Sequence, residues 1–178
     1  MIFELVLTTI SMESILLFNN YDLQAVLENQ KPQIGKAVSE IPSEWLGTFE
    51  QKELVLQLKK KLELAPIVLM EDEISVDQKE TKVDVRYDVS RYIRDRSRPV
   101  YVEGTKLTYY LPFTGDASLF KCRPNHFNFN PPRATTVKED ELIFEFDVPS
   151  GEDITKTKTA FERILSDLRQ WIGWVNAQ

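Results

Sequence analysis

Two stretches of the chain alternate apolar and charged side chains, and this period of two limits the fold more than any other feature. They span residues 81–89 and 141–148. A strand with one buried face and one solvated face produces this alternation, because successive side chains point to opposite sides of a sheet. The alternating apolar positions are Val83, Val85, Tyr87 and Val89 in the first stretch, and Leu142, Phe144 and Phe146 in the second.

Shorter apolar runs predict further strands around these two. They lie at 67–70, 100–102, 106–111 and 134–137, and the acidic stretch 71–80 is interpreted as a loop or a strand extension. Gly104 permits a turn, and the polar residues 138–140 suit a hairpin. Because the connections are too short for helical crossovers, we expect a mostly antiparallel sheet.

The first third of the chain predicts helices. Residues 1–19 are apolar without a clean period and are interpreted as helical. Residues 21–41 repeat apolar positions every three or four residues, as an amphipathic helix does. Pro32 and Gly35 interrupt this pattern, which indicates either a kink or two short helices.

Two further helices begin at capping patterns. Thr48 followed by Gln51 resembles a capping box and opens a helix that extends to about Leu64. Ser150 followed by Asp153 resembles a helix N-cap and opens the last element.

The last element has an apolar repeat of seven residues. This repeat fits a helix docked on the sheet or the start of a coiled coil. Leu165 and Ile172 widen the apolar face beyond a narrow seam, which favours docking. The repeating positions are Ile154, Phe161, Leu168 and Val175.

These patterns predict a single α+β domain over residues 1–178. It consists of a helical part (1–65), a mostly antiparallel sheet (66–149) and a C-terminal amphipathic helix (150–178). Because no terminating glycine or proline stands near the end of the chain, we also consider it as the N-terminal part of a longer bacterial protein.

The composition argues against several classes of protein. Glu4 and Glu13 interrupt the apolar start, and no run reaches the ~18–20 residues of a membrane span. The start also lacks a basic leader and a cleavage site, so we expect a cytoplasmic location. One Cys and one His give no disulfide and no zinc or haem pattern, and the 6 Gly residues form no phosphate loop. We therefore expect no cofactor, no metal and no membrane partner.

The net charge of -6 is unevenly distributed. Residues 86–133 carry 9 Lys and Arg against 4 Asp and Glu, a balance of +5 between acidic flanks. Clustered cations attract phosphates and carboxylates, so this region is a candidate anion-binding site. The alternative is that its cations pair with the flanks.

An arginine cluster carries much of this charge. It is interleaved with Tyr87, Tyr92 and Tyr101, and guanidinium groups with aromatic rings are typical of a nucleotide or oligonucleotide site. The alternative is a solvated loop paired with the acidic residues 71–73. The cluster consists of Arg86, Arg91, Arg94, Arg96 and Arg98.

The stretch 108–133 holds the only Cys and the only His. Lys121, Arg123 and Arg133 complete the candidate anion-binding set, provided that folding brings them beside the arginine cluster. A Cys122–His126 catalytic dyad is disfavoured because a lone Cys among aromatic residues is usually a small buried hydrophobe. We interpret the stretch as an irregular crossing between two halves of the sheet, with a turn at Gly115 and prolines that fix an extended edge.

No catalytic motif emerges, so the sequence favours a non-catalytic binding or interaction module. Its partner is expected to be an anionic ligand, a nucleic acid or another protein, with self-association through the C-terminal helix as a further option. The alternative function is a metal-dependent phosphodiesterase or nuclease, because acidic residues with a lysine on adjacent strands hold Mg²⁺ in such enzymes. The candidate residues are Asp84, Asp88, Glu103 and Lys106.

Overall fold

The computed structural model describes residues 14–42 and 51–178, and the fold is α+β, as predicted. Its centre is a five-stranded sheet in which every strand pair is antiparallel. The strand order is β3 (Val68–Leu69), β5 (Tyr101–Thr114), β9 (Glu141–Pro149) and β8 (Thr136–Val137), and β4 (Ser75–Asp84) pairs with β5 beside β3.

One face of this sheet is apolar. Every second side chain is buried along β9 and from Leu107 to Phe113 of β5, as the period of two requires. The buried positions are Leu107, Tyr109, Leu111 and Phe113 in β5, and Leu142, Phe144, Phe146 and Val148 in β9.

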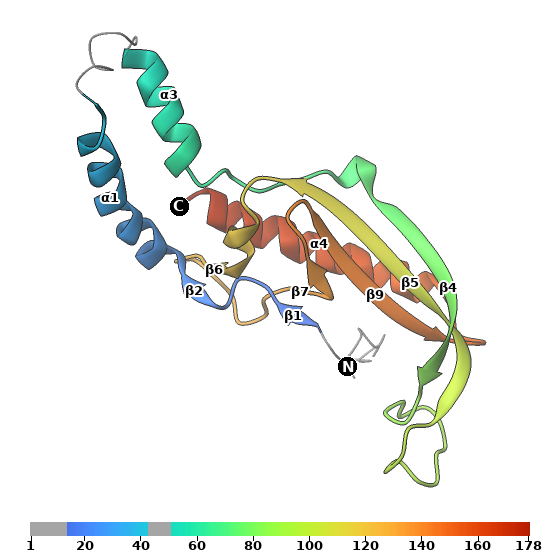
Figure 1. Ribbon diagram of the computed structural model, residues 1–178. Helices are drawn as coiled ribbons and strands as arrows, with labels where there is room; N and C mark the ends of the chain where they lie inside the picture. Colours follow the sequence, from blue (N-terminus) through green and yellow to red (C-terminus); the bar gives the residue numbers. More distant parts are fainter. Residues whose placement is uncertain (1–13, 43–50) are drawn as a thin grey trace.

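The C-terminal helix α4 (Thr155–Asn176) lies across this apolar face (Figure 1). The ring of Phe161 stacks on Tyr109 at 4.2 Å and meets Phe144 edge-on at 5.4 Å. The predicted docking is therefore confirmed. Leu168 and Val175 are buried as well, so three of the four heptad positions pack inside the domain, whereas Ile154, just before the helix, is 43% exposed.

Residues 14–22 form two short strands joined by a bend and contain no helix, so the helix predicted for 1–19 is wrong over its last residues; residues 1–13 lie outside the described part. Two short strands pair here with strands that flank the irregular stretch, and Leu17 and Phe18 are buried between them. A segment that bonds to distant strands needs no helical period. The pairs are β1 (Ile15–Leu16) with β7 (Arg133–Ala134), antiparallel, and β2 (Tyr21–Asp22) with β6 (Cys122–Arg123), parallel.

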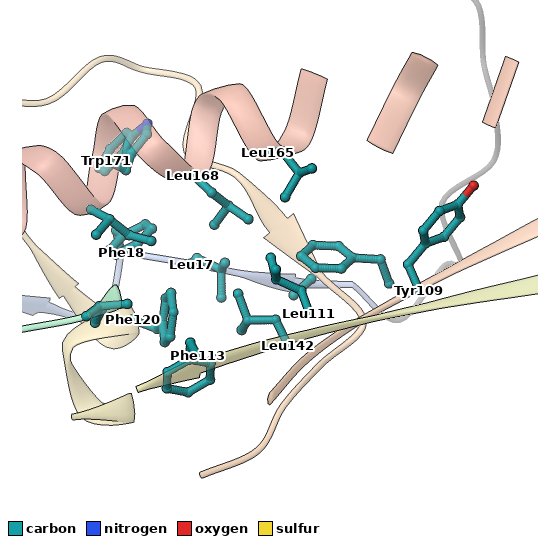
Figure 2. Packing of buried hydrophobic residues seen from close by; sticks show 14 of the residues in the cluster. Leu17, Phe18, Tyr109, Leu111, Phe113, Phe120, Leu142, Leu165, Leu168 and Trp171 are labelled. Atoms are coloured by element: carbon teal, nitrogen blue, oxygen red, sulfur yellow. The ribbon is translucent and has the colours of Figure 1, made fainter. Parts of the chain in front are cut away.

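Phe18 connects this extended segment to the core. Its ring lies 5.5 Å from Trp171 of α4 and 5.5 Å from Phe120. Figure 2 shows these rings beside Leu111 and Leu142 of the sheet. The N-terminal segment is thus part of the same core as the sheet and α4.

The first helix, α1 (Leu23–Ser39), is a single helix in place of the two short ones considered from the sequence. Asp22 caps it, because its carboxylate accepts a hydrogen bond from the backbone N–H of Ala25 at 3.0 Å. Pro32 and Gly35 both lie on the exposed side of the helix. There water can satisfy a carbonyl that a proline leaves without its donor.

The second helix, α3 (Gln51–Leu62), lies beside α1, and both project from the sheet (Figure 1). The proposed cap residue Thr48 lies outside the described residues. Among the helices that the structure describes, none combines the length and the apolar content needed to cross a bilayer.

Two predicted strand boundaries are wrong. The alternation at 81–89 placed the strand too late, because the strand β4 ends at Asp84. A short 3-10 helix, η1 (Glu71–Glu73), comes before it, and all ten residues of β4 pair with β5. Gly104 is not a turn but lies inside β5. A Cβ at Gly104 would lie 2.6 Å from the carbonyl oxygen of Val148, so close backbone approach explains this glycine. The hairpin that joins β8 and β9 is confirmed.

Candidate anion-binding surfaces

The arginine cluster lies on the loop that joins β4 to β5, residues 85–100, which we call the β4–β5 loop. Asp84 closes its neck, because its Oδ1 accepts hydrogen bonds from the backbone N–H groups of Arg86 and Val100, both at 3.1 Å. Desolvation by burial raises the pKa of the Asp84 carboxyl. The two N–H groups and the neighbouring Arg86 guanidinium outweigh it and hold this pKa below its usual range. The carboxylate of Asp84 therefore serves the loop.

Three of the five arginines in this loop are held by the protein itself. The Nε of Arg86 lies 2.8 Å from Asp84, and the Nε of Arg91 lies 2.8 Å from Asp88. Arg91 also reaches Glu152 at 3.3 Å. Arg96 donates to the backbone carbonyl oxygens of Arg86 at 2.5 Å and Arg91 at 2.8 Å. These guanidinium groups stabilise a long loop and are not free for a ligand.

The remaining two, Arg94 and Arg98, are exposed and form no ion pair within the part of the chain that the structure describes. Tyr92, 95% exposed, is their neighbour in sequence. The predicted pairing of this cluster with residues 71–73 is not observed, since Glu71 pairs with Arg169 of α4 instead.

The second group of cations lies on residues 121–133, which we call the aromatic loop. It leaves the sheet region after the 3-10 helix η2 (Ala117–Lys121) and returns at β7. Lys121, Arg123 and Arg133 are all exposed, and none forms an ion pair with a described residue. The loop therefore offers three positive charges to solvent.

Two exposed rings lie on the same loop as these cations. Phe127 is 41% exposed and Phe129 is 97% exposed. Their centroids are 6.0 Å apart, and the guanidinium carbon of Arg123 lies 5.1 Å from the centroid of Phe127. Tyr21, 59% exposed, lies on β2 next to Cys122 of β6. The surface thus combines aromatic rings with unpaired cations.

The aromatic loop is anchored at several points. Pro124 and Pro132 are buried, and the carbonyl oxygen of Pro132 accepts a hydrogen bond from Leu17 at 3.0 Å. The backbone N–H of Asn125 donates to the side chain of Gln178 at 2.8 Å. These contacts hold the base of the loop in place.

The single Cys and the single His are not arranged as a catalytic pair. Cys122 is 3% exposed, and its Sγ lies 3.5 Å from the carbonyl oxygen of Ser118. Burial raises the pKa of the Cys122 thiol, which disfavours the thiolate that a nucleophile needs. His126 is exposed and its ring packs edge-on against Trp174 at 4.8 Å.

The carboxylates considered for a metal site are dispersed. Glu103 and Lys106 point to opposite faces of β5, because they stand three positions apart and successive side chains of a strand alternate between its two faces. Lys106 is engaged by Glu145 at 2.9 Å and Asp147 at 3.9 Å. Within residues 14–42 and 51–178, no group of three or more His, Cys, Asp or Glu side chains is placed to hold a metal ion.

The two groups of cations lie far apart. The β4–β5 loop precedes β5, and the aromatic loop follows the other end of that strand (Figure 1). A strand of 14 residues extends roughly 45 Å at about 3.3 Å per residue. The condition set from the sequence, that folding brings the two groups side by side, is therefore not met.

An apolar hollow of about 410 Å³ lies between α1 and α3. Its lining consists of the aliphatic side chains of Ile34, Val55, Leu58 and Leu62 and the charged residues Lys59 and Glu63. Neither group of candidate cations contributes to this hollow, and its mainly aliphatic lining does not suit an anion.

No protein-family model, no curated protein and no solved structure matches this chain.

Proposed function

We propose that this chain is a non-catalytic binding module that recognises an anionic partner through the aromatic loop. The observation that supports this most strongly is that the three cations of the loop are exposed and form no ion pair with a described residue. Lys121, Arg123 and Arg133 are exposed and unpaired within the described chain, although the protein as a whole has a net charge of -6. Acidic residues are abundant, yet none of those in residues 14–42 and 51–178 forms an ion pair with these three cations. An external anion would do so.

The β4–β5 loop is the weaker candidate for the same function. Three of its five arginines already satisfy carboxylates or carbonyl oxygens of the loop itself. Only Arg94 and Arg98, which are exposed, are left to meet a ligand. None of the three cations of the aromatic loop forms an ion pair with a described residue, and Arg123 contacts only the ring of Phe127 among the aromatic side chains.

Anchoring adds to the case. The bonds from Asn125 to Gln178 and from Leu17 to Pro132 hold the base of the aromatic loop before any partner arrives. A preformed surface loses less conformational entropy on binding than a loop that must first be ordered. We place this binding in the cytoplasm, where the single free Cys122, buried in the fold, remains reduced.

The test is a binding titration with labelled single-stranded and duplex oligonucleotides. If three phosphates are neutralised, affinity falls about 20- to 40-fold between 50 and 200 mM salt. The triple variant Lys121→Gln, Arg123→Gln, Arg133→Gln is expected to lose this binding.

A matched control removes the same charge elsewhere. Lys156, Lys158 and Arg163 are exposed on α4, so replacing these three with Gln changes the net charge equally and is expected to leave affinity almost unchanged. Equal losses in both triple variants would mean that only net charge matters. A loss confined to Arg94→Gln, Arg98→Gln would move the site to the β4–β5 loop.

A further inference from the structure

We infer that the anionic partner is a single-stranded nucleic acid whose bases stack on Phe129 and Phe127 while the cations of the aromatic loop contact its phosphates. This inference rests on the proposed function and adds the class of ligand. It begins from the two rings, which the binding of a simple anion would not require.

Phe129 is the most exposed large apolar side chain of the described residues, at 97%. Phe127 follows two positions earlier, and its ring meets Phe129 at 84°. The pair therefore offers faces in two directions to flat ligands. Unpaired bases present such faces, and stacking on aromatic side chains is the usual way in which proteins hold single strands.

The position of Arg123 fits the same ligand. Its guanidinium lies over the Phe127 ring at 5.1 Å, so a positive charge stands directly beside one stacking surface. In a single strand each base is attached to a phosphate, and a ring with an adjacent guanidinium matches that repeat. Lys121 and Arg133 flank the loop and extend the positive charge to both of its ends.

The amide side chains between the rings favour a nucleic acid over a membrane. Asn125, Asn128 and Asn130 alternate with His126 and the two phenylalanines in the sequence. The side chain of Asn128 accepts a hydrogen bond from the backbone N–H of Asn130 at 2.9 Å, which tightens the tip. Burial of the rings in a bilayer would dehydrate these amides at considerable cost, whereas base edges can hydrogen-bond to them.

Single strands also fit better than a duplex. In a duplex the base faces are stacked on one another and closed to a protein, so only the phosphates would be available to this surface. The rings would then add nothing to affinity. This difference separates the inference from the proposed function.

The experiment measures fluorescence anisotropy of a labelled thymidine oligomer of about twelve nucleotides. An abasic oligomer of equal length carries the same phosphates without bases. The wild-type chain is expected to bind the thymidine oligomer more tightly than the abasic one. The double variant Phe127→Ala, Phe129→Ala is expected to lose about 5- to 140-fold in affinity for each stacked base and to bind both oligomers alike.

Two controls make the result decisive. Tyr92→Ala removes a ring of similar exposure, 95%, from the β4–β5 loop and is expected to leave binding unchanged. Because both phenylalanine rings are exposed, the double variant is expected to keep the wild-type melting temperature, which circular dichroism checks.

Four outcomes would overturn the inference. Equal binding of the thymidine oligomer by the wild-type chain and the double variant would refute stacking and leave phosphate binding in place, and so would equal affinity for the abasic and the thymidine oligomers. Preferential binding to vesicles of anionic phospholipid, lost in the double variant, would assign the rings to a membrane. No binding to any polyanion at low salt would refute the proposed function as well.

Discussion

Replacement of Phe18 with Ala tests the arrangement that supports the aromatic loop. Phe18 is 0% exposed and lies between β1 and β2, the two strands that pair with β7 and β6 at the ends of that loop. Its ring contacts Trp171 and Phe120 at centroid distances of 5.5 Å. Loss of the ring is therefore expected to destabilise the core and the base of the aromatic loop together.

The magnitude follows from these contacts. Truncation of a buried Phe to Ala costs about 3–5 kcal/mol. Each aromatic pair contributes about 0.5–1.5 kcal/mol beyond area burial, and Phe18 makes two, which places the expected loss at the upper end, about 4–5 kcal/mol. In a chain of this length that corresponds to a fall in melting temperature of about 8–20 °C.

Phe18 also has a backbone angle φ of 54°, in the left-handed region that favours glycine. Alanine at this position keeps the backbone cost, whereas glycine removes about 1–2 kcal/mol of it. The usual advantage of Ala over Gly in the folded state is therefore expected to disappear, and Phe18→Gly should be no less stable than Phe18→Ala.

Urea denaturation followed by circular dichroism measures these differences. Asn19→Ala, at an exposed neighbouring position, is the control and is expected to change stability by less than about 0.5 kcal/mol. A loss below about 1.5 kcal/mol for Phe18→Ala would refute the placement of residues 14–22 against the core.

Other predictions concern the glycines, the thiol and one ion pair. Gly115→Ala is expected to destabilise by more than about 3 kcal/mol, because φ is 106° and the new Cβ would lie 2.2 Å from the carbonyl oxygen of Pro66; Gly173→Ala, in α4 with nothing within 4 Å, is expected to stabilise by about 0.5–1 kcal/mol. Thermal melts of the two variants should shift in opposite directions. Cys122 is expected to react with a thiol reagent only at the rate of unfolding, and a rapid reaction in the native protein would contradict its burial. The hydrogen bond from Arg169 holds the pKa of Glu71 below its usual range, so Arg169→Gln should cost about 0.2–1 kcal/mol at neutral pH after screening by solvent. Since a depressed folded pKa stabilises above the unfolded value, this cost should vanish as pH falls below about 4 and through the folded pKa, as urea titrations at several pH values can show.

Local sequence patterns predicted the strands and helices that are buried along one continuous face. The alternation at 141–148 identified β9, because one face of that strand is buried along its whole length. The widened apolar face at Leu165 and Ile172 identified the docking of α4. In both cases one face of the element is buried, so apolar residues recur at regular intervals in its sequence.

The sequence failed where structure depends on distant partners. Gly104 fits a turn as well as a close approach of two strands, and only the position of Val148 decides between them. Residues 14–22 show no period, because short strands bonded to β6 and β7 bury side chains irregularly. The left-handed conformation of Phe18 has no signal in composition.

For the candidate site, composition identified the cations but not which of them form ion pairs and hydrogen bonds within the protein. Nothing in the spacing of the β4–β5 loop showed that Arg96 donates to two backbone carbonyl oxygens and Arg91 to two carboxylates. Lys121, Arg123 and Arg133 were selected from charge alone, and their exposure and the contact of Arg123 with the Phe127 ring emerged only from the structure. Which cations are free is a property of the folded chain.

The position of the binding surface is the central claim, and NMR titration of the isotope-labelled chain with the thymidine oligomer tests it most directly. We predict that the largest chemical-shift changes occur at Phe127, Phe129 and the cations of the aromatic loop, with little change at Arg94 and Arg98. Changes centred on the β4–β5 loop, or spread evenly over exposed lysines and arginines, would contradict the account.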